Sequence, residues 1–307
     1  MLCAISVDLD EIGQYHKIHG LPPPRGEVAY AVYRLALDRW EQFARSCRLP
    51  LAFFAVGSDM AIPGNAERLR RLASLGHEIG NHSLDHCYDL TRLDSFEQRR
   101  QVGVGREVLQ GATGSPVEGF RAPGYTMSDR LLSIVRETGH RYDSSVFPCA
   151  PYLLAKLAVL SWRQLQRRSS ASIVGDPRVV LAPTSPYSPG VPYWTEGGHR
   201  SFLELPVQVT PRLRLPVIGT SLTLAPAPLA RALVRACVGQ LLINLEFHGI
   251  DALGEEDGLE ALRGHQPDVT LCAAAKLNRL AEMVEVLREA GYRFVTPGEA
   301  ARRQLGA

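Results

Sequence analysis

Two histidines four residues apart, His82 and His86, are the first residues whose type and spacing suggest chemistry. They lie in the stretch GHEIGNHSLDHCYDL, directly after a short apolar run. A spacing of four residues would place both imidazoles on one side of a helical turn, where both could reach one metal ion. Two histidines at this spacing also occur on solvated helix surfaces, so the pair indicates a metal site only if a third ligand exists. His77, at the other end of the run, is expected to be a surface or packing residue.

An acidic pair near the start of the chain, Asp8 and Asp10, offers the missing carboxylate. The two residues are two apart on a predicted strand, so their side chains project to the same face. Two His and one Asp with an open water position form a common catalytic zinc arrangement, and zinc lowers the pKa of its bound water to about 7. The alternative is that acids at a strand end cap the next helix or bind water.

Three further polar residues stand at or in predicted strands. Arg121 in GFRAPGY could orient a neighbouring carboxylate and keep it ionised, and the Pro-Gly turn that follows can aim backbone N–H groups at an oxyanion. A plain turn with an exposed arginine is the alternative. His248 in LINLEFHGIDAL could transfer a proton or be a satisfied core histidine. Asp143 in RYDSSV could cap a loop or orient an imidazole, and the pattern leaves both open.

The elements that must position these residues alternate between apolar β-rich runs and runs with a helical period. This alternation predicts a parallel sheet with crossover helices. The predicted strands are Cys3–Leu9, Leu51–Val56, His77–Asn81, Glu118–Arg121, Tyr142–Val146, Phe202–Val207, Leu241–Phe247 and Tyr292–Val295. The predicted helices are Gly26–Ser46, Asn65–Leu75, Ser95–Gln110, Ser128–Glu137, Leu229–Val238 and Ala273–Ala290. In parallel α/β barrels the strand ends and the loops after them form the active face, so we expect the polar residues to converge on one pocket.

The length of 307 residues suits one α/β barrel domain over residues 1–307. Ten of the 21 prolines lie between Pro177 and Pro228, where they exclude long helices and central strands. A Pro-rich loop insertion at about residues 148–228 is therefore expected to cover one mouth of the barrel.

The overall composition narrows the class of protein. The hydrophobic content of 45%, charged content of 21% and net charge of +2 indicate no nucleic-acid partner. The six cysteines form no CxxC pair, so free thiols in a reducing compartment are expected. The first residues, MLCAISVDLD, lack the features of a signal peptide, which favours the cytoplasm. The longest apolar stretches are too short or too broken by proline to cross a bilayer, so no transmembrane segment is expected.

The ordered motifs Asp-x-Asp, His-Ser-x-x-His, Arg-x-Pro-Gly-Tyr, Tyr-Asp-Ser-Ser and Phe-His resemble the polysaccharide deacetylase family, also called carbohydrate esterase family 4 or the NodB homology domain. The similarity covers nearly the whole chain, from Ile5 to about Val295. It implies a distorted (β/α)7-type, TIM-like barrel. It also implies a divalent metal, usually Zn2+ with Co2+, Ni2+ or Fe2+ as alternatives, bound by Asp10, His82 and His86, with Ser83 bracing the histidine loop.

The resemblance further implies roles for the remaining residues. Asp8 would be the general base, held in place by Arg121. His248 would be the general acid, with Asp143 a candidate to orient it. The backbone N–H of Tyr125 would join the metal in stabilising the oxyanion.

Two departures from the family pattern bear on the substrate. Secreted members usually have adjacent aspartates followed by Gly, whereas this chain has Asp8-Leu9-Asp10-Glu11, which is similar to an intracellular branch of allantoinase-like, cyclic-imide-hydrolase-like and peptidoglycan-deacetylase-like proteins. The fourth motif also lacks the expected Trp.

The function that the residues and the resemblance together imply is hydrolysis of non-peptide C–N amide bonds by a metal-dependent enzyme. An N-deacetylase of an N-acetylated amino sugar or glycan precursor is the first hypothesis. A small-molecule amidase or cyclic-imide hydrolase is the second, and a non-catalytic carbohydrate-binding barrel is the third. Members of the intracellular branch can assemble, so a homo-oligomer is also considered.

Overall fold

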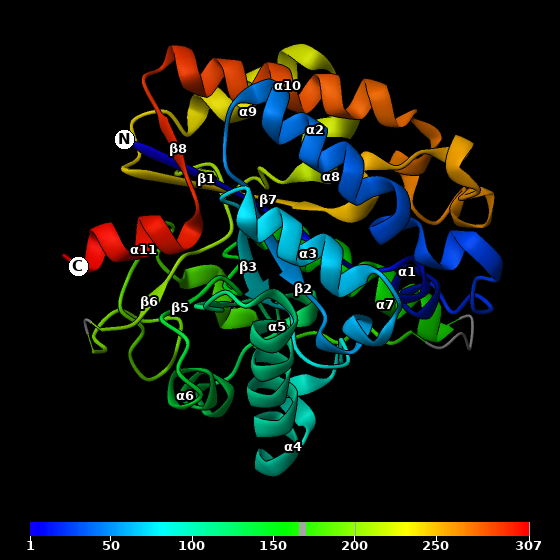
Figure 1. The fold of residues 1–307 in the computed structure, drawn as a ribbon. Helices are drawn as coiled ribbons and strands as arrows, with labels where there is room; N and C mark the ends of the chain where they lie inside the picture. Colours follow the sequence, from blue (N-terminus) through cyan, green and yellow to red (C-terminus); the bar gives the residue numbers. More distant parts are fainter. Residues whose placement is uncertain (166–169, 200, 307) are drawn as a thin grey trace.

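A single curled parallel sheet of eight strands forms the centre of the computed structural model, which describes residues 1–165, 170–199 and 201–306 (Figure 1). The strands run in the order β6-β5-β4-β3-β2-β1-β7, and β8 pairs with β1. Each of them overlaps a predicted strand, and the predicted fold class is confirmed. The strands are β1 Leu2–Asp8, β2 Ala52–Ala55, β3 Glu78–Asn81, β4 Gly119–Phe120, β5 Tyr142–Asp143, β6 Leu203–Glu204, β7 Leu242–His248 and β8 Arg293–Val295.

Helices cover the outside of the sheet, with α2 and α10 side by side at the top of Figure 1 and α3 and α5 in front. The helices are α1 Ile12–Ile18, α2 Leu37–Cys47, α3 Asn65–Ser74, α4 Ser95–Arg99, α5 Gly105–Thr113, α6 Asp129–Glu137, α7 Ala150–Leu165, α8 Gly219–Leu224, α9 Ala227–Ala236, α10 Ala273–Glu289 and α11 Pro297–Leu305. One turn of π-helix precedes α2, and another joins α4 to α5.

The helix starts follow local sequence signals. Ser128 caps α6 by accepting a hydrogen bond from the backbone N–H of Leu131, and Thr296 caps α11 through the N–H of Glu299. Apolar residues on one side of α2 then pack on the sheet, where the Trp40 ring stacks on Phe247 at 5.6 Å between centroids. The helix-period patterns do not predict α1, α7, α8 or α11.

Strand β1 is the hub of the sheet. It pairs with β7 along its whole length, with β2 through its second half and with β8 through its first half. In this register Asp8 lies directly beside His248. Two residues that are 240 positions apart in sequence therefore share one end of the sheet, because parallel strands bring their downstream ends to the same edge.

The chain after β6 turns back toward β7 and narrows the gap in the curled sheet. The N–H of Gln208 donates to the carbonyl of Asn244 on β7 at 3.0 Å. The side-chain amide of Asn244 in turn donates to the backbone carbonyls of Leu205 and Pro206. These bonds hold the two ends of the sheet together although β6 and β7 are not paired as strands.

Residues 148–228, expected as a loop insertion, contain both loops and regular elements. Their prolines do keep residues 177–218 in extended segments, a short 3-10 turn and the two-residue strand β6. The 16-residue helix α7 precedes this part, and the proline pattern does not predict it. Strand β6 lies at the edge of the central sheet, so the segment contributes to the barrel itself.

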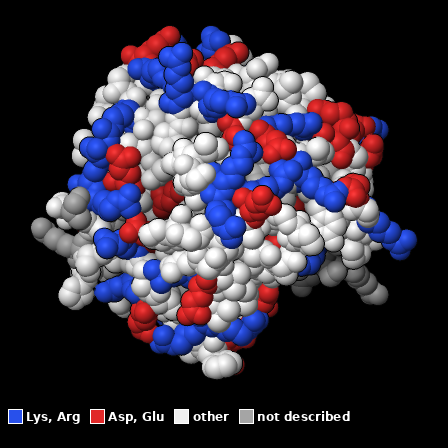
Figure 2. All heavy atoms as spheres, in the orientation of Figure 1, with Lys and Arg blue, Asp and Glu red and all other residues white. Residues whose placement is uncertain are grey.

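The face shown in Figure 2 carries basic and acidic side chains interspersed with one another. Ion pairs such as Arg68–Asp38 and Arg71–Glu41 join α3 to α2 on the surface. Within the described ranges, no helix is both long enough and apolar enough to cross a membrane.

Candidate active site

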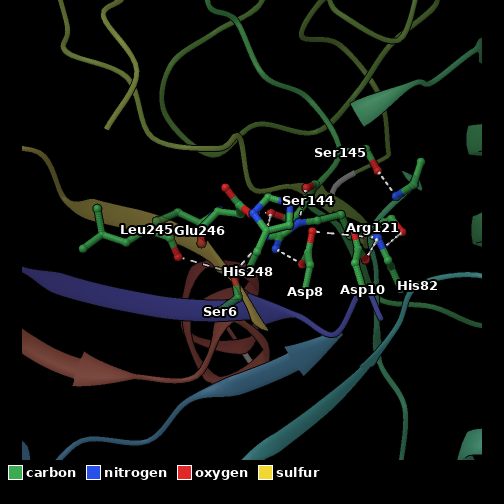
Figure 3. Close-up of polar contacts among 12 residues, drawn as sticks. Ser6, Asp8, Asp10, His82, Arg121, Ser144, Ser145, Leu245, Glu246 and His248 are labelled. Atoms are coloured by element: carbon green, nitrogen blue, oxygen red, sulfur yellow. Dashed lines mark hydrogen bonds and ion pairs between the residues drawn. The ribbon is translucent and has the colours of Figure 1, made fainter. Parts of the chain in front are cut away.

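Three buried side chains, Asp10, His82 and His86, converge at the downstream ends of β1 and β3. Oδ1 of Asp10 lies 3.3 Å from Nε2 of His82 and 2.9 Å from Nε2 of His86. Figure 3 shows Asp10 and His82 next to each other, beside Asp8 and Arg121. One atom from each residue lies within 4.8 Å of the others, so the three could hold a metal ion.

The two histidines reach this position through a loop and not through the helical turn that their spacing predicted. Residues 82–87 are not helical, and both Ser83 and His86 have left-handed backbone angles, with φ of 67° and 54°. The hydroxyl of Ser83 accepts a hydrogen bond from the N–H of His86 at 3.1 Å. The carbonyls of Ser83 and Leu84 accept bonds from Gly57 and Ser58, which fixes the loop against the end of β2.

A hydrogen bond from the next strand sets the orientation of the His82 ring. Nδ1 of His82 lies 2.8 Å from the backbone carbonyl of Arg121. A carbonyl can only accept, so Nδ1 carries a proton, and Nε2 is the ring nitrogen that faces Asp10 and is free to bind a cation once it is deprotonated. This arrangement is the one that orients a metal-binding imidazole.

The protonation states and the unpaired atoms of this cluster fit a divalent cation. Among the described residues, Oδ1 of Asp10 and both ring nitrogens of His86 are buried without a hydrogen-bond partner. Burial raises the pKa of Asp10, but the imidazoles of His86 and His82 outweigh it and hold that pKa well below its ordinary value. Burial lowers the pKa of His86 despite the nearby Asp10. Burial lowers the pKa of His82 as well, but Asp8 and Asp10 outweigh it and raise that pKa, so metal binding would release a proton from His82. An ionised carboxylate and a neutral imidazole are the forms that bind metal, and this donor set suits zinc among other divalent ions.

Asp8 lies beside this cluster and is held by Arg121. Nη1 of Arg121 donates to Oδ1 of Asp8 at 2.6 Å, while the same guanidinium donates to Ser6, to the hydroxyl of Ser144 and to the carbonyl of Ser144. The guanidinium carbon Cζ of Arg121 lies 4.2 Å from the centre of the Phe54 ring. The second oxygen of Asp8 points the other way, 3.9 Å from Nε2 of His82. Burial raises the pKa of Asp8, and the charges of Arg121 and His82 oppose that rise.

His248 ends β7 on the other side of Asp8, and its partner is Glu246. Nδ1 of His248 lies 2.9 Å from Oε1 of Glu246, and the imidazole is 22% exposed whereas the carboxylate is fully buried. Burial lowers the pKa of His248, but the Glu246 carboxylate outweighs it and raises that pKa well above its ordinary value. Sequence reasoning missed Glu246, although its place two residues before His248 in LEFH puts both side chains on one face of a strand.

Two roles were left open for Asp143, holding a loop and orienting an imidazole, and its contacts match the first. Its carboxylate accepts hydrogen bonds from the hydroxyl and the N–H of Ser145 and lies against Glu204. The Ser145 hydroxyl also accepts a bond from the N–H of Ala122 at 2.8 Å. Asp143 therefore braces the loop after Arg121, and the group that orients His248 is Glu246, which lies on the same strand as the histidine.

Tyr125 lies in a tight turn in the Arg-x-Pro-Gly-Tyr segment. Its φ of 58° and the φ of 63° at Gly124 are both left-handed. The backbone N–H of Tyr125 donates to the carbonyl of Ala122 at 3.1 Å. An oxyanion would have to compete with this bond, so the oxyanion role of Tyr125 remains a prediction.

Residues 42–142 match the sequence profile of the polysaccharide deacetylase family, and this range includes His82, His86 and Arg121. This part of the chain is therefore similar to the polysaccharide deacetylase family. Among curated proteins, it is similar to the peptidoglycan deacetylase of Helicobacter pylori, with 20% identity over 148 residues. The matched part is 48% of this chain and 50% of the relative, so the similarity spans about half the length of that protein.

Solved structures of polysaccharide deacetylase relatives share the fold along nearly the whole chain. A protein described as a polysaccharide deacetylase from Mycobacterium smegmatis superimposes with a TM-score of 0.51 at 18% identity, covering 96% of this chain and 93% of that one. A family 4 acetyl xylan esterase from Clostridium thermocellum, solved with a cobalt ion, superimposes with a TM-score of 0.52 at 15% identity, covering 100% and 93%. At these identities the likeness establishes the fold, a curled (β/α)7-type barrel.

A cavity of about 580 Å3 opens onto the candidate site. Asp8, Asp10, His82 and His248 all line it, as does Tyr125. Much of the remaining wall is apolar. The apolar lining residues include Ile18, Val159, Leu160, Ile218, Leu224 and Ile250.

Proposed function

We propose that this protein is a metal-dependent hydrolase of non-peptide C–N amide bonds, acting as an N-deacetylase on an N-acetylated amino sugar or glycan precursor. The observation that carries the proposal is that a possible cation site and a fixed carboxylate meet at one cavity. Asp10, His82 and His86 are suited to hold a cation, and Asp10 and His82 line the cavity. Asp8, which is paired with Arg121, lines it as well. The match of residues 42–142 to the polysaccharide deacetylase family supports the same reaction class.

Zinc or a similar ion, bound by Asp10, His82 and His86, would polarise the acetyl carbonyl and acidify a water molecule. Asp8 has the position of the general base, because one of its oxygens is bonded to Arg121 and the other faces the cation-binding side chains. The proton that Asp8 accepts comes from the attacking water, whose oxygen forms the new bond to the carbonyl carbon. Arg121 keeps the Asp8 carboxylate fixed during this transfer.

His248 has the position of the general acid. The Glu246 carboxylate favours its protonated form, so the imidazolium can donate its Nε2 proton to the leaving nitrogen as the C–N bond breaks. The products are acetate and a free amine. Asp8 and His248 are adjacent in the sheet register, which allows one substrate amide to reach both.

The test is acetate release from N-acetylglucosamine derivatives by protein loaded with Zn2+ or Co2+, with metal content measured by elemental analysis. Wild type should hold about one metal ion per chain and release acetate. His86→Ala should lose both the metal and the activity, whereas the control His77→Gln, altered in the same stretch of sequence, should keep both.

Two outcomes would contradict the proposal. Absence of metal in the wild type after loading would remove the proposed site. A metal-loaded protein that hydrolyses small cyclic imides and releases no acetate from the amino sugars would move the function to the small-molecule amidase hypothesis.

A further inference from the structure

Helix α7, Ala150–Leu165, has an arrangement opposite to that of an ordinary surface helix. Its outward face is largely apolar, with Ser161 and Gln164 as exposed polar residues. The large apolar residues of this face are exposed: Leu154 by 65%, Leu157 by 39%, Trp162 by 62% and Leu165 by 77%. A surface helix usually buries its apolar stripe and turns its charged residues toward water. Here the apolar stripe itself faces outward.

The charged residues of α7 lie on its inner side. Among the described residues of this helix, Lys156 and Arg163 are the charged ones. Lys156 is partly buried and donates to the carbonyl of Gly124, and Arg163 is 8% exposed and contacts His19. The outward face therefore has apolar area without a charge to solvate it, and a single aromatic residue, Trp162, near its end.

The opposite side of the same helix lines the active-site cavity. Tyr152, Ala155, Lys156 and Val159 recur at helical spacing along this wall, and the apolar residues Ile218, Leu224 and Ile250 line the cavity as well. Two of the apolar lining residues, Val159 and Leu224, are 52% and 43% exposed, so they stand at the rim. Apolar surface thus continues from the outward face of α7 over the rim and into the cavity.

An apolar wall this close to the site favours a substrate with an apolar part. The tyrosines that line the cavity, Tyr15, Tyr88, Tyr125 and Tyr152, suit a sugar ring, whereas its aliphatic side chains would bind a polysaccharide weakly. A chain of methylene groups, in contrast, gains about 0.8 kcal/mol for each group buried. Molecules with long apolar chains reside in bilayers, so an enzyme that takes them must meet the lipid surface.

We propose that α7 lies on a lipid bilayer and that the cavity receives the apolar chain of a lipid-linked N-acylated amino sugar, whose amide reaches the site. This inference rests on the proposed deacetylase function for the identity of the head group. Helices that lie in the interfacial plane of a membrane bury an apolar face at the headgroup boundary, and Trp is enriched at that depth. The exposed stripe and the rim are the two surfaces that such docking would cover.

Membrane docking is tested by flotation with vesicles of phosphatidylcholine and phosphatidylglycerol. The variant Leu154→Ser/Trp162→Ser/Leu165→Ser changes only strongly exposed side chains of α7, so folding should be unaffected. Its matched control is Leu75→Ser/Phe96→Ser/Leu241→Ser, which removes residues that are 55%, 79% and 78% exposed on other elements. The partition coefficient of the α7 variant onto vesicles should be at least about tenfold lower than that of the wild type, and the control should bind like the wild type.

Chain recognition is tested with a pair of substrates that share one head group, methyl and octyl N-acetylglucosaminide, below the micelle concentration. The ratio of kcat/KM, octyl over methyl, should be at least about 100 in the wild type. Ala155→Phe narrows the cavity and should lower the octyl-over-methyl ratio of kcat/KM by at least about tenfold. Ala158→Phe, on the outward side of the same helix, should leave both values unchanged.

The two proposals fail in different ways. No vesicle binding by the wild type, together with equal kcat/KM for both glycosides, would overturn the membrane inference while the deacetylase function stands. Vesicle binding that depends on α7, with no acetate released from either glycoside, would overturn the amino-sugar deacetylase function. If the stripe instead covers a second copy of the chain, the α7 variant will change the mass in solution from dimer to monomer and vesicles will not bind, which also overturns the inference.

Discussion

His248 and Glu246 lie on the same face of strand β7 and meet at 2.9 Å between Nδ1 and Oε1. The strand itself therefore carries both the proposed proton donor and the group that orients it. The pair is fixed by backbone pairing with β1, in which Glu246 lies beside Ser6 and His248 beside Asp8. An imidazole oriented by its own strand needs no contribution from a distant loop.

Glu246→Gln should move the alkaline limb of the kcat/KM pH profile to lower pH. A general acid works only while protonated, so activity is lost as pH rises through its pKa, and the Glu246 carboxylate is what raises the pKa of His248. Asp143→Asn is the matched comparison, and its alkaline limb should stay in place because that carboxylate bonds Ser145. If the alkaline limb moved in Asp143→Asn and not in Glu246→Gln, Asp143 and not Glu246 would be the group that orients His248.

Arg121→Lys should lower the free energy of unfolding by about 2–4 kcal/mol and remove most of the turnover. Lysine keeps the charge but cannot reproduce the fork that reaches Asp8, Ser6 and Ser144 together, and each lost bond to a charged buried group costs about 1.5–3 kcal/mol. Urea unfolding and acetate release measure the two effects. Arg141→Lys, at an ion pair with Glu118 where the arginine is 54% exposed, should change stability by less than about 0.5 kcal/mol.

Asp59→Asn should stabilise the metal-free protein at pH 8. Burial, with the nearby charges of Glu11 and Asp10, raises the pKa of Asp59 to about 7. A carboxyl whose pKa is raised in the folded state stabilises that state below its unfolded pKa of 3.8, and this contribution is lost as pH rises through about 7. The variant should therefore gain about 1–3 kcal/mol at pH 8 and nothing near pH 4. Equal stabilisation at both pH values would mean that ionisation of Asp59 is not the cause.

Gly119→Ala should destabilise the barrel, because an added Cβ would lie 2.1 Å from the ring of Tyr142. That ring is fully buried and its hydroxyl donates to Glu78 at 2.7 Å, so it cannot move aside freely. Overpacking of this kind costs about 1–3 kcal/mol. Gly111→Ala in α5 meets nothing within 4 Å and should instead stabilise by about 0.5–1 kcal/mol. Thermal unfolding of both variants separates the two expectations.

The sheet was predictable from sequence because its strands are apolar runs of the right length between helical patterns. Polar residues such as Asp8, Arg121 and His248 stand out because they end those runs. The parallel arrangement then places them at one edge, and the structure brings them together. What could not be predicted is contact geometry. The spacing of His82 and His86 indicated a helical turn, yet two left-handed residues produce the same convergence in a loop.

The sequence patterns also failed to predict elements whose position depends on packing and not on a periodic arrangement of apolar residues. Helix α7 has apolar residues around most of its circumference, so its sequence lacks the alternation of apolar and polar faces that predicts an amphipathic helix. Glu246 is one of several polar residues in an otherwise apolar strand, and its position two residues before His248 is the sequence signal that could have revealed the pair. The roles of Asp8, Asp10, His82, His86 and Tyr125 stay predictions, to be decided by the variants above.

The position of β1 at the hub of the sheet has a consequence for biosynthesis. Strand β1 leaves the ribosome before its partners β7 and β8, which end at His248 and Val295. At about 5–20 residues per second, β1 must wait roughly 15–60 s for its last partner. During that time its apolar edge has no native neighbour except β2, which makes the nascent chain a client for chaperones. Synonymous codons that slow or speed translation of the second half should therefore change the yield of folded protein without changing a single residue.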